Sequence, residues 1–127
     1  MLARFLLPVS LSCAMAIAGC ATALEPTPPC TMIAVWSLAI TVRDAATAQL
    51  VCDADVLATR GDTTYRLQRI GAGEECTYYG PQETAGTFDV QASRAGYQTT
   101  TVRSVDVRSD ECHVITIRLT LQLRPSG

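Results

Sequence analysis

The C-terminal stretch His113-Val-Ile-Thr-Ile-Arg-Leu-Thr-Leu-Gln-Leu-Arg124 carries the clearest secondary-structure signal in the chain. Its odd-numbered positions are aliphatic from Ile115 to Leu123, and its even-numbered positions are mostly polar. Successive side chains of a β-strand point to opposite faces of the sheet, so this period of two predicts a half-buried strand of about eleven residues. A shift of one residue would expose five aliphatic side chains, and the pairing register should therefore be firmly set.

The same period of two recurs upstream, and no convincing helical period of 3.6 residues occurs after Cys30. Alternating apolar positions occur in residues 36–42, 54–58, 65–67 and 88–92, and residues 97–107 are rich in Thr and Val. Turns that contain Gly or Asp separate these segments. We expect an all-β fold, a single antiparallel Greek-key sandwich of about seven strands with almost no helix.

The composition of the 127-residue chain leaves room for one domain and excludes several classes of protein. The chain is 48% hydrophobic and 17% charged, which is too apolar for a disordered protein. Its ten basic residues are all arginines, they form no cluster, and the formal net charge is −2. A nucleic-acid partner is therefore not expected, because binding to phosphates needs a concentrated positive face.

The N-terminal residues 1–19 have the pattern of a signal peptide. Arg4 precedes an uncharged, mostly apolar run over 5–19, which is shorter than the roughly 20 residues that span a bilayer as a helix. The run ends in Ile17-Ala-Gly-Cys20, which resembles the lipobox of bacterial lipoproteins. The resemblance implies cleavage before Cys20, diacylglycerol on its sulfur, palmitate-type acylation, and attachment to the membrane of a bacterial cell envelope. By the sorting rule of enteric lipoproteins, Ala21 in place of Asp suggests the outer membrane.

Two other fates of this N-terminus remain open. Ordinary signal peptidase could cleave after the small-x-small pattern Ala21-Thr-Ala23, and the apolar run could stay as a membrane anchor, which its length disfavours. In the lipoprotein reading, residues 20–30 form a tether, whose Pro-rich part Glu25-Pro-Thr-Pro-Pro29 should run extended. The sandwich then occupies residues 31–124 and a short tail residues 125–127.

Four cysteines remain after cleavage: Cys30, Cys52, Cys76 and Cys112. An exported chain with four cysteines is expected to form two disulfides, and three connectivities are possible. The rival reading is a zinc site. Neighbouring cysteines are separated by 21, 23 and 35 residues, whereas structural zinc sites and redox-active cysteines usually come in close pairs. We expect no metal and no cofactor.

Short motifs in the strands resemble a known family. The stretch Gly86-Thr-Phe-Asp-Val90 followed by Gly96-Tyr97 is similar to the "G-T-aromatic-x-V … G-Y" signature of carboxypeptidase regulatory-like domains, and Ile40-Thr-Val-Arg-Asp-Ala-Ala-Thr47 is similar to their opening strand and turn. The family has Gly where this chain has Ala48. The resemblance covers most of residues 35–124, and it implies a transthyretin-like sandwich and a non-catalytic accessory or interaction domain.

The same resemblance implies a disulfide pairing. In this topology the first and last strands are commonly parallel neighbours. Cys30 precedes the first strand and Cys112 precedes the last, so these two are expected to pair. Cys52 is then left for Cys76.

The titratable residues offer little sign of catalysis. His113 is the only histidine, and Ser104, Ser109, Asp106 and Asp110 lie too near it in sequence to suggest a separately supported triad. We expect a partly buried structural histidine and no enzyme; a cleft in which His113 meets a carboxylate would argue for one. Asp53, Asp55, Asp62, Glu74 and Glu75 are read as solvated carboxylates, because calcium needs six to eight converging oxygens.

The aromatic residues give the best candidate for binding. Tyr78 and Tyr79 are adjacent and are predicted to lie in a loop, where they could form a platform for a sugar ring or a protein surface. The alternative is one packed and one singly exposed Tyr, and Trp36 is assigned to the core. We expect an envelope lipoprotein that acts as an interaction or accessory module with a protein or glycan partner. The alternative function is a carbohydrate-binding module for cell-wall or external glycan, which an exposed coplanar aromatic pair would indicate.

Overall fold

The computed structural model describes residue 19 and residues 29–71 and 76–127, and these form an all-β structure. Within these residues there is no helix, and accordingly none long and apolar enough to cross a bilayer. The signal-peptide and lipobox predictions, including lipidation of Cys20, fall outside the described residues, as do Glu74 and Glu75.

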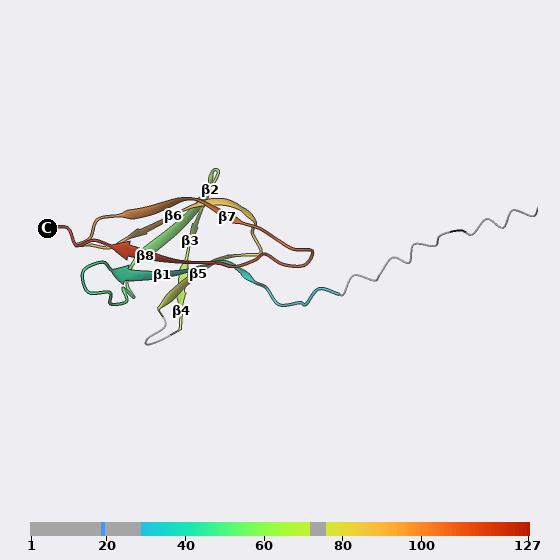
Figure 1. Ribbon diagram of the computed structural model, residues 1–127, viewed down its shortest axis with the longest axis horizontal. Helices are drawn as coiled ribbons and strands as arrows, with labels where there is room; N and C mark the ends of the chain where they lie inside the picture. Colours follow the sequence, from blue (N-terminus) through green and yellow to red (C-terminus); the bar gives the residue numbers. More distant parts are fainter. Residues whose placement is uncertain (1–18, 20–28, 72–75) are drawn as a thin grey trace, which may run out of the picture.

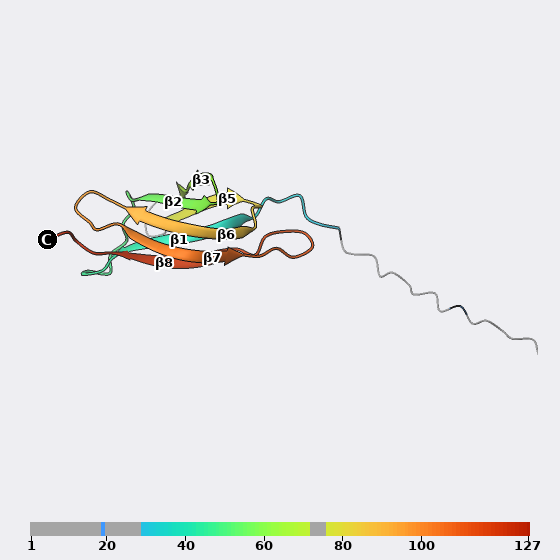
Figure 2. The ribbon, with the colours of Figure 1, turned by 90° about the horizontal axis from the view of Figure 1, so that it is seen from above.

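Eight strands form two four-stranded sheets that pack as two layers (Figures 1 and 2). One sheet has the order β4-β5-β1-β8 and the other the order β3-β2-β6-β7. The strands are β1 (Trp36–Asp44), β2 (Asp55–Arg60), β3 (Thr63–Arg66), β4 (Gln68–Ile70), β5 (Thr77–Gln82), β6 (Gly86–Ser93), β7 (Thr100–Val107) and β8 (Ile117–Leu123). The expected all-β, two-sheet fold is confirmed.

The number of strands is eight and not about seven, and one pair of strands departs from an antiparallel sandwich. The predicted strand around Tyr65 is two strands, because the chain passes from one sheet to the other at Leu67, which is buried between β3 and β4. The sandwich is not purely antiparallel, and the parallel pairing of its first and last strands is the one that the family resemblance implied. β1 pairs antiparallel with β5 but parallel with β8, in a register that sets Ile40 beside Leu119.

The core lies between the sheets and follows the alternation in the sequence. The inward positions of β1, β2 and β6 are fully buried, and they are joined there by the C-terminal half of β8. These core side chains are Leu38, Ile40, Val42, Val56, Ala58, Phe88, Val90, Ala92, Leu121 and Leu123. At about 25 cal/mol per Å² of buried apolar surface, this layer is the main favourable term for folding.

The last strand is shorter than predicted. β8 has seven residues instead of about eleven, since residues 108–115 turn back on themselves. The Ile115 N–H donates to the Arg108 carbonyl at 2.7 Å, and Ser109 forms a β-bridge with Val114. This turn breaks the alternation, so Val114 is buried while Ile115 is exposed. The predicted common face from His113 to Leu123 is therefore wrong at its N-terminal end.

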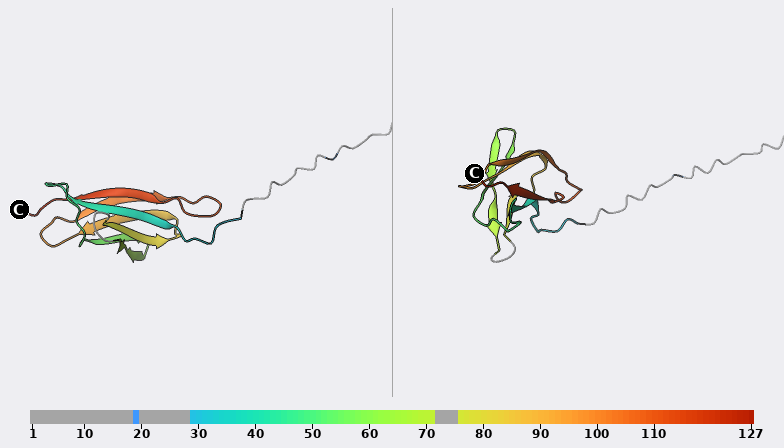
Figure 3. Two further views of the ribbon diagram at one scale, coloured as in Figure 1. Left: turned by 90° about the horizontal axis from the view of Figure 1, so that it is seen from below. Right: turned by 60° about the vertical axis from the view of Figure 1, so that its left-hand side comes forward.

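Two disulfides join segments that are distant in sequence, Cys30–Cys112 and Cys52–Cys76, with Cα–Cα distances of 5.1 and 5.2 Å. These are the pairs that the family resemblance implied. The first bridge ties the chain just before β1 to the loop before β8, at the end of the sandwich that we call the tether pole (residues 29–35, 82–86 and 108–116). Figure 3 shows the described N-terminal segment beside the β7–β8 loop at this pole, with the C-terminus at the opposite end, the distal pole (residues 44–50, 94–99 and 124–127).

Candidate functional site

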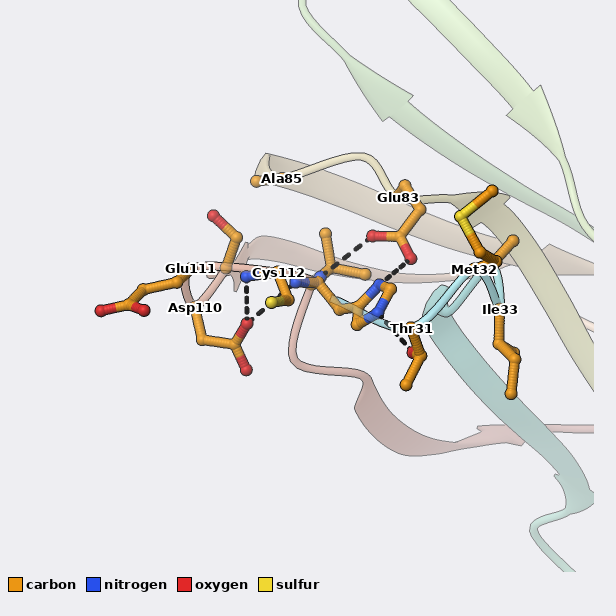
Figure 4. Close-up of a pocket in the computed structure, with 12 residues that line it drawn as sticks. Thr31, Met32, Ile33, Glu83, Ala85, Asp110, Glu111 and Cys112 are labelled. Atoms are coloured by element: carbon orange, nitrogen blue, oxygen red, sulfur yellow. Dashed lines mark hydrogen bonds and ion pairs between the residues drawn. The ribbon is translucent and has the colours of Figure 1, made fainter. Parts of the chain in front are cut away.

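At the tether pole the only histidine meets a carboxylate and a hydroxyl group (Figure 4). His113 Nδ1 lies 2.6 Å from Glu83 Oε1, and His113 Nε2 lies 2.9 Å from Thr31 Oγ1. These residues come from the β7–β8 loop, the turn between β5 and β6, and the segment that leads into β1. The imidazole thus joins three chain segments at one point.

Glu83 is held in place by backbone groups of both neighbouring segments. Its Oε1 also accepts the Val35 N–H at 2.8 Å, and its Oε2 accepts the Val114 N–H at 3.2 Å. Glu83 lies in the tight turn with a φ of 46°, a conformation that non-glycine residues rarely adopt. The bond from Val35 first, and then those from His113 and Val114, lower the pKa of the Glu83 carboxyl below its usual value, against the opposing effect of burial.

The loop that carries His113 is organised by Asp110. Its Oδ1 accepts the N–H groups of Cys112 and His113, both at 2.8 Å, in an Asx turn. These backbone bonds lower the pKa of the Asp110 carboxyl. Because Cys112 is also bridged to Cys30, the loop brings His113 beside the residue that follows Cys30, which is Thr31.

The order hydroxyl, imidazole, carboxylate is that of a hydrolase triad, and His113 does meet a carboxylate. A triad also needs N–H donors aimed at the reacting oxygen. The backbone N–H groups of Val35, Cys112, His113 and Val114 all point instead at the Glu83 or Asp110 carboxylates. We call the contacts among Thr31, Glu83, Asp110 and His113 the clamp, because they join three chain segments.

The two adjacent tyrosines do not form a joint platform. They lie in strand β5 and not in a loop, so their side chains point to opposite faces. Tyr78 is only 3% exposed; its hydroxyl donates to the Val51 carbonyl and accepts the Ala54 N–H, both at 2.9 Å. Burial raises the pKa of this hydroxyl. The predicted shared surface of Tyr78 and Tyr79 is wrong, and the alternative of one packed tyrosine applies.

Tyr79 instead pairs with Trp36 beside a shallow hollow. The two ring centroids are 5.9 Å apart and the planes are inclined by 41°. The hollow has a volume of about 400 Å³, and Tyr65 adds a third ring to its wall. Its polar lining is Thr64, Arg66, Gln68 and Gln82. Sequence alternation missed this site because it assigned Trp36 to the core. Trp36 is only half-buried, and so is Tyr65, which packs against the margin of the core.

Two of the aspartates that were expected to be solvated pair with arginines. Asp53 lies 2.8 Å from Arg94, and Asp55 lies 2.9 Å from Arg66. Across residues 29–71 and 76–127 there is no group of three His, Cys, Asp or Glu side chains that could hold a metal ion. The four cysteines of this part of the chain form the two disulfides.

No protein-family model matches the chain, and no curated protein matches it in sequence. The candidate sites are therefore the clamp at the tether pole and the hollow beside Trp36 and Tyr79, both defined by geometry alone.

Proposed function

We propose that this disulfide-stapled sandwich is a non-catalytic lipoprotein of the bacterial cell envelope, anchored through Cys20 and acting as an interaction or accessory module. The Cys30–Cys112 disulfide is the observation that carries the proposal. It fixes the domain at the point where the tether enters, and it suits an oxidising compartment. We place the protein in the outer membrane on the basis of Ala21.

We further assign the domain to the carboxypeptidase regulatory-like group, with its transthyretin-like Greek-key connectivity. The parallel pairing of β1 with β8 supports this assignment, as does the geometry of Gly86 in the Gly86-Thr-Phe signature. Gly86 has a φ of 134°, and a Cβ atom there would lie 2.6 Å from Arg60 Cδ. The positive φ favours glycine at this position, and a larger residue would also require the Arg60 side chain to move.

The absence of catalysis is part of the proposal. It is supported by the clamp geometry, in which the N–H donors around His113 already serve the Glu83 and Asp110 carboxylates. Incubation of the purified protein with a fluorophosphonate probe should leave Thr31 unlabelled. Labelling that disappears in a His113→Gln variant would contradict this part of the proposal.

The anchor can be tested by metabolic labelling. Cells that express the protein are grown with an alkyne analogue of palmitate, and the purified chain is examined for the label. Cys20→Ser should abolish labelling and release the protein from the membrane fraction. Cys13→Ser is the matched control, because Leu11-Ser12 before Cys13 makes a poor lipobox. Equal labelling of wild type and Cys20→Ser would refute the anchor.

The partner can be sought by cross-linking intact cells and analysing the captured protein by mass spectrometry. One reproducible protein partner would support the interaction module and name its pathway. Recovery of envelope glycan alone would favour the second candidate function.

That second candidate, a carbohydrate-binding module, is favoured by the Trp36–Tyr79 pair and the polar side chains around it. Aromatic rings pack against sugar rings, and Arg and Gln can bond their hydroxyls. Tyr79→Ala and Trp36→Ala should weaken binding to the glycan recovered from cells. Arg103→Ala, an exposed arginine away from the hollow, is the control. Unchanged glycan binding in both aromatic variants, with intact folding, would exclude the hollow.

A further inference from the structure

Exposed apolar side chains gather at the tether pole. Of the four exposed large hydrophobic residues in the described chain, three lie there: Met32 (102% exposed), Ile33 (72%) and Ile115 (53%). Met32 and Ile33 belong to the segment between Cys30 and β1, and Ile115 belongs to the loop that the disulfide ties to it. The fourth, Ile70 in β4, is 43% exposed and lies outside this pole. Exposed apolar clusters mark surfaces that contact a partner or a membrane.

The tether pole is also the part of the domain that the anchor keeps nearest to the bilayer; this step rests on the proposed lipidation of Cys20. Nine residues, 21–29, separate Cys20 from Cys30. A fully extended chain covers at most about 3.6 Å per residue, so the pole stays within about 35 Å of the lipid surface. Such a tether keeps the effective concentration of the membrane high, and a weak contact is then enough to hold the domain there.

We propose that Met32, Ile33 and Ile115 dock the tether pole onto the surface of a zwitterionic phospholipid bilayer. Side chains of this kind enter the boundary between headgroups and acyl chains. The charges around them exclude an anionic surface: Asp110 and Glu111 are exposed, Glu83 faces His113, and Arg108 is paired with Asp106. The docked domain stands with β1 and β8 rising from the membrane and its C-terminus pointing away (Figure 1).

A photo-reactive side chain tests this contact directly. The mature lipidated protein is reconstituted into phosphatidylcholine vesicles with p-benzoylphenylalanine in place of Ile33 or, as the matched control, in place of Ile70. After irradiation, lipid adducts are measured by mass spectrometry. We expect several-fold more adduct at position 33 than at position 70. The adduct at position 33 should fall when the vesicles contain anionic lipid, and again when Met32→Asp and Ile115→Asp are added.

The outcomes separate the docking from the anchor. Flotation of the vesicles shows whether the protein is attached at all, and failure to float would overturn the anchor and the docking together. Flotation with equal adduct at positions 33 and 70 would overturn the docking alone and leave the anchor standing. Photo-cross-links from position 33 to a second protein chain in place of lipid would also overturn it. Thermal melts of each variant, which should match the wild type at these exposed sites, show that the fold is retained.

Discussion

At each pole of the sandwich there is a carboxylate that accepts three hydrogen bonds, but the donors lie at different distances along the chain. At the tether pole, Glu83 accepts from Val35, His113 and Val114, which lie 30 residues or more away in sequence. At the distal pole, Asp44 accepts the N–H groups of Ala46 and Thr47 at 2.7 and 3.0 Å within its own turn, and the Tyr97 hydroxyl at 2.6 Å.

The distal pole is therefore held mainly by residues close in sequence, and the tether pole by residues far apart in sequence. The distal turn can form from neighbouring residues, and Tyr97 then attaches it to the β6–β7 connection. The tether pole forms only when three segments that are distant in sequence have met. Its disulfide, Cys30–Cys112, links residues 82 positions apart, whereas Cys52–Cys76 links residues 24 positions apart. The tether pole should therefore be the more sensitive of the two to the loss of a crosslink and to acid.

Removal of the Cys30–Cys112 bridge should give the largest effect. In the loop-entropy description, the long closure contributes about 4.5 kcal/mol and the short one about 3.5 kcal/mol to the free energy of unfolding. Chemical denaturation should show a larger loss of stability for the double variant Cys30→Ala/Cys112→Ala than for Cys52→Ala/Cys76→Ala. Full reduction should abolish the cooperative melt, since a domain's whole stability is about 5–15 kcal/mol. A reduced protein that still melts cooperatively would refute this.

Acid should act through the lowered carboxyl pKa values at both poles. A carboxyl whose folded pKa lies below its unfolded value stabilises the fold above the unfolded pKa, and this contribution is lost as the pH falls through the folded one. For Glu83 the loss begins near its ordinary value of 4.5, and for Asp44 near 3.8. Glu83→Gln should lower stability at pH 7 and flatten its decline below about pH 5. A decline that is equally steep in wild type and variant, measured by denaturation at several pH values, would contradict this assignment.

Tyr97→Phe tests the distal pole alone. The Tyr97 hydroxyl is the largest cause of the lowered pKa of Asp44, and it links the first turn to the β6–β7 connection. Its loss should lower Tm by a few degrees, because a single hydrogen bond contributes modestly to stability. The variant should also lose part of the acid sensitivity assigned to Asp44. Tyr65→Phe, at a tyrosine with a half-buried ring outside the distal pole, is the comparison variant.

Ala48→Gly should give the smallest effect, and it should be a gain. Ala48 has a φ of 62°, in the left-handed region that glycine adopts more easily than alanine. Its N–H donates to the Asp44 carbonyl at 2.8 Å, and this bond keeps the turn in that conformation. Relief of this backbone strain should raise the free energy of unfolding by about 0.5–1 kcal/mol. Thr47→Gly, one residue earlier, removes the hydroxyl that accepts the Gln49 N–H and should destabilise the turn instead.

The sequence predicted the fold best where alternation is strict. Val56 and Ala58, like Phe88 and Val90, are buried as their period of two required. The prediction failed where a local turn interrupts the alternation of apolar and polar residues. The Asx turn at Asp110 redirects the chain before β8, so His113 faces Glu83 and not the core.

The candidate sites were harder to predict than the fold, because each joins residues that no sequence spacing connects. Glu83 contacts His113, which lies 30 residues later in the chain, and Trp36 contacts Tyr79 on the neighbouring strand. The adjacent tyrosines misled for the opposite reason, since neighbours in a strand point apart. The segment that contains them, which was expected to be a loop, is strand β5.

The parallel pairing of β1 with β8 has a mechanical consequence. Both strands begin at the tether pole and end at the distal pole, and the Cys30–Cys112 bridge joins them just before they begin. A pull on the tether reaches both strands at their starting ends. If the load is taken up at the C-terminal end, the shortest covalent path runs from Cys30 through the bridge to Cys112 and on along β8, so the strands between Cys30 and Cys112 lie outside the loaded path. The bridge makes the point of attachment the reinforced end of the molecule.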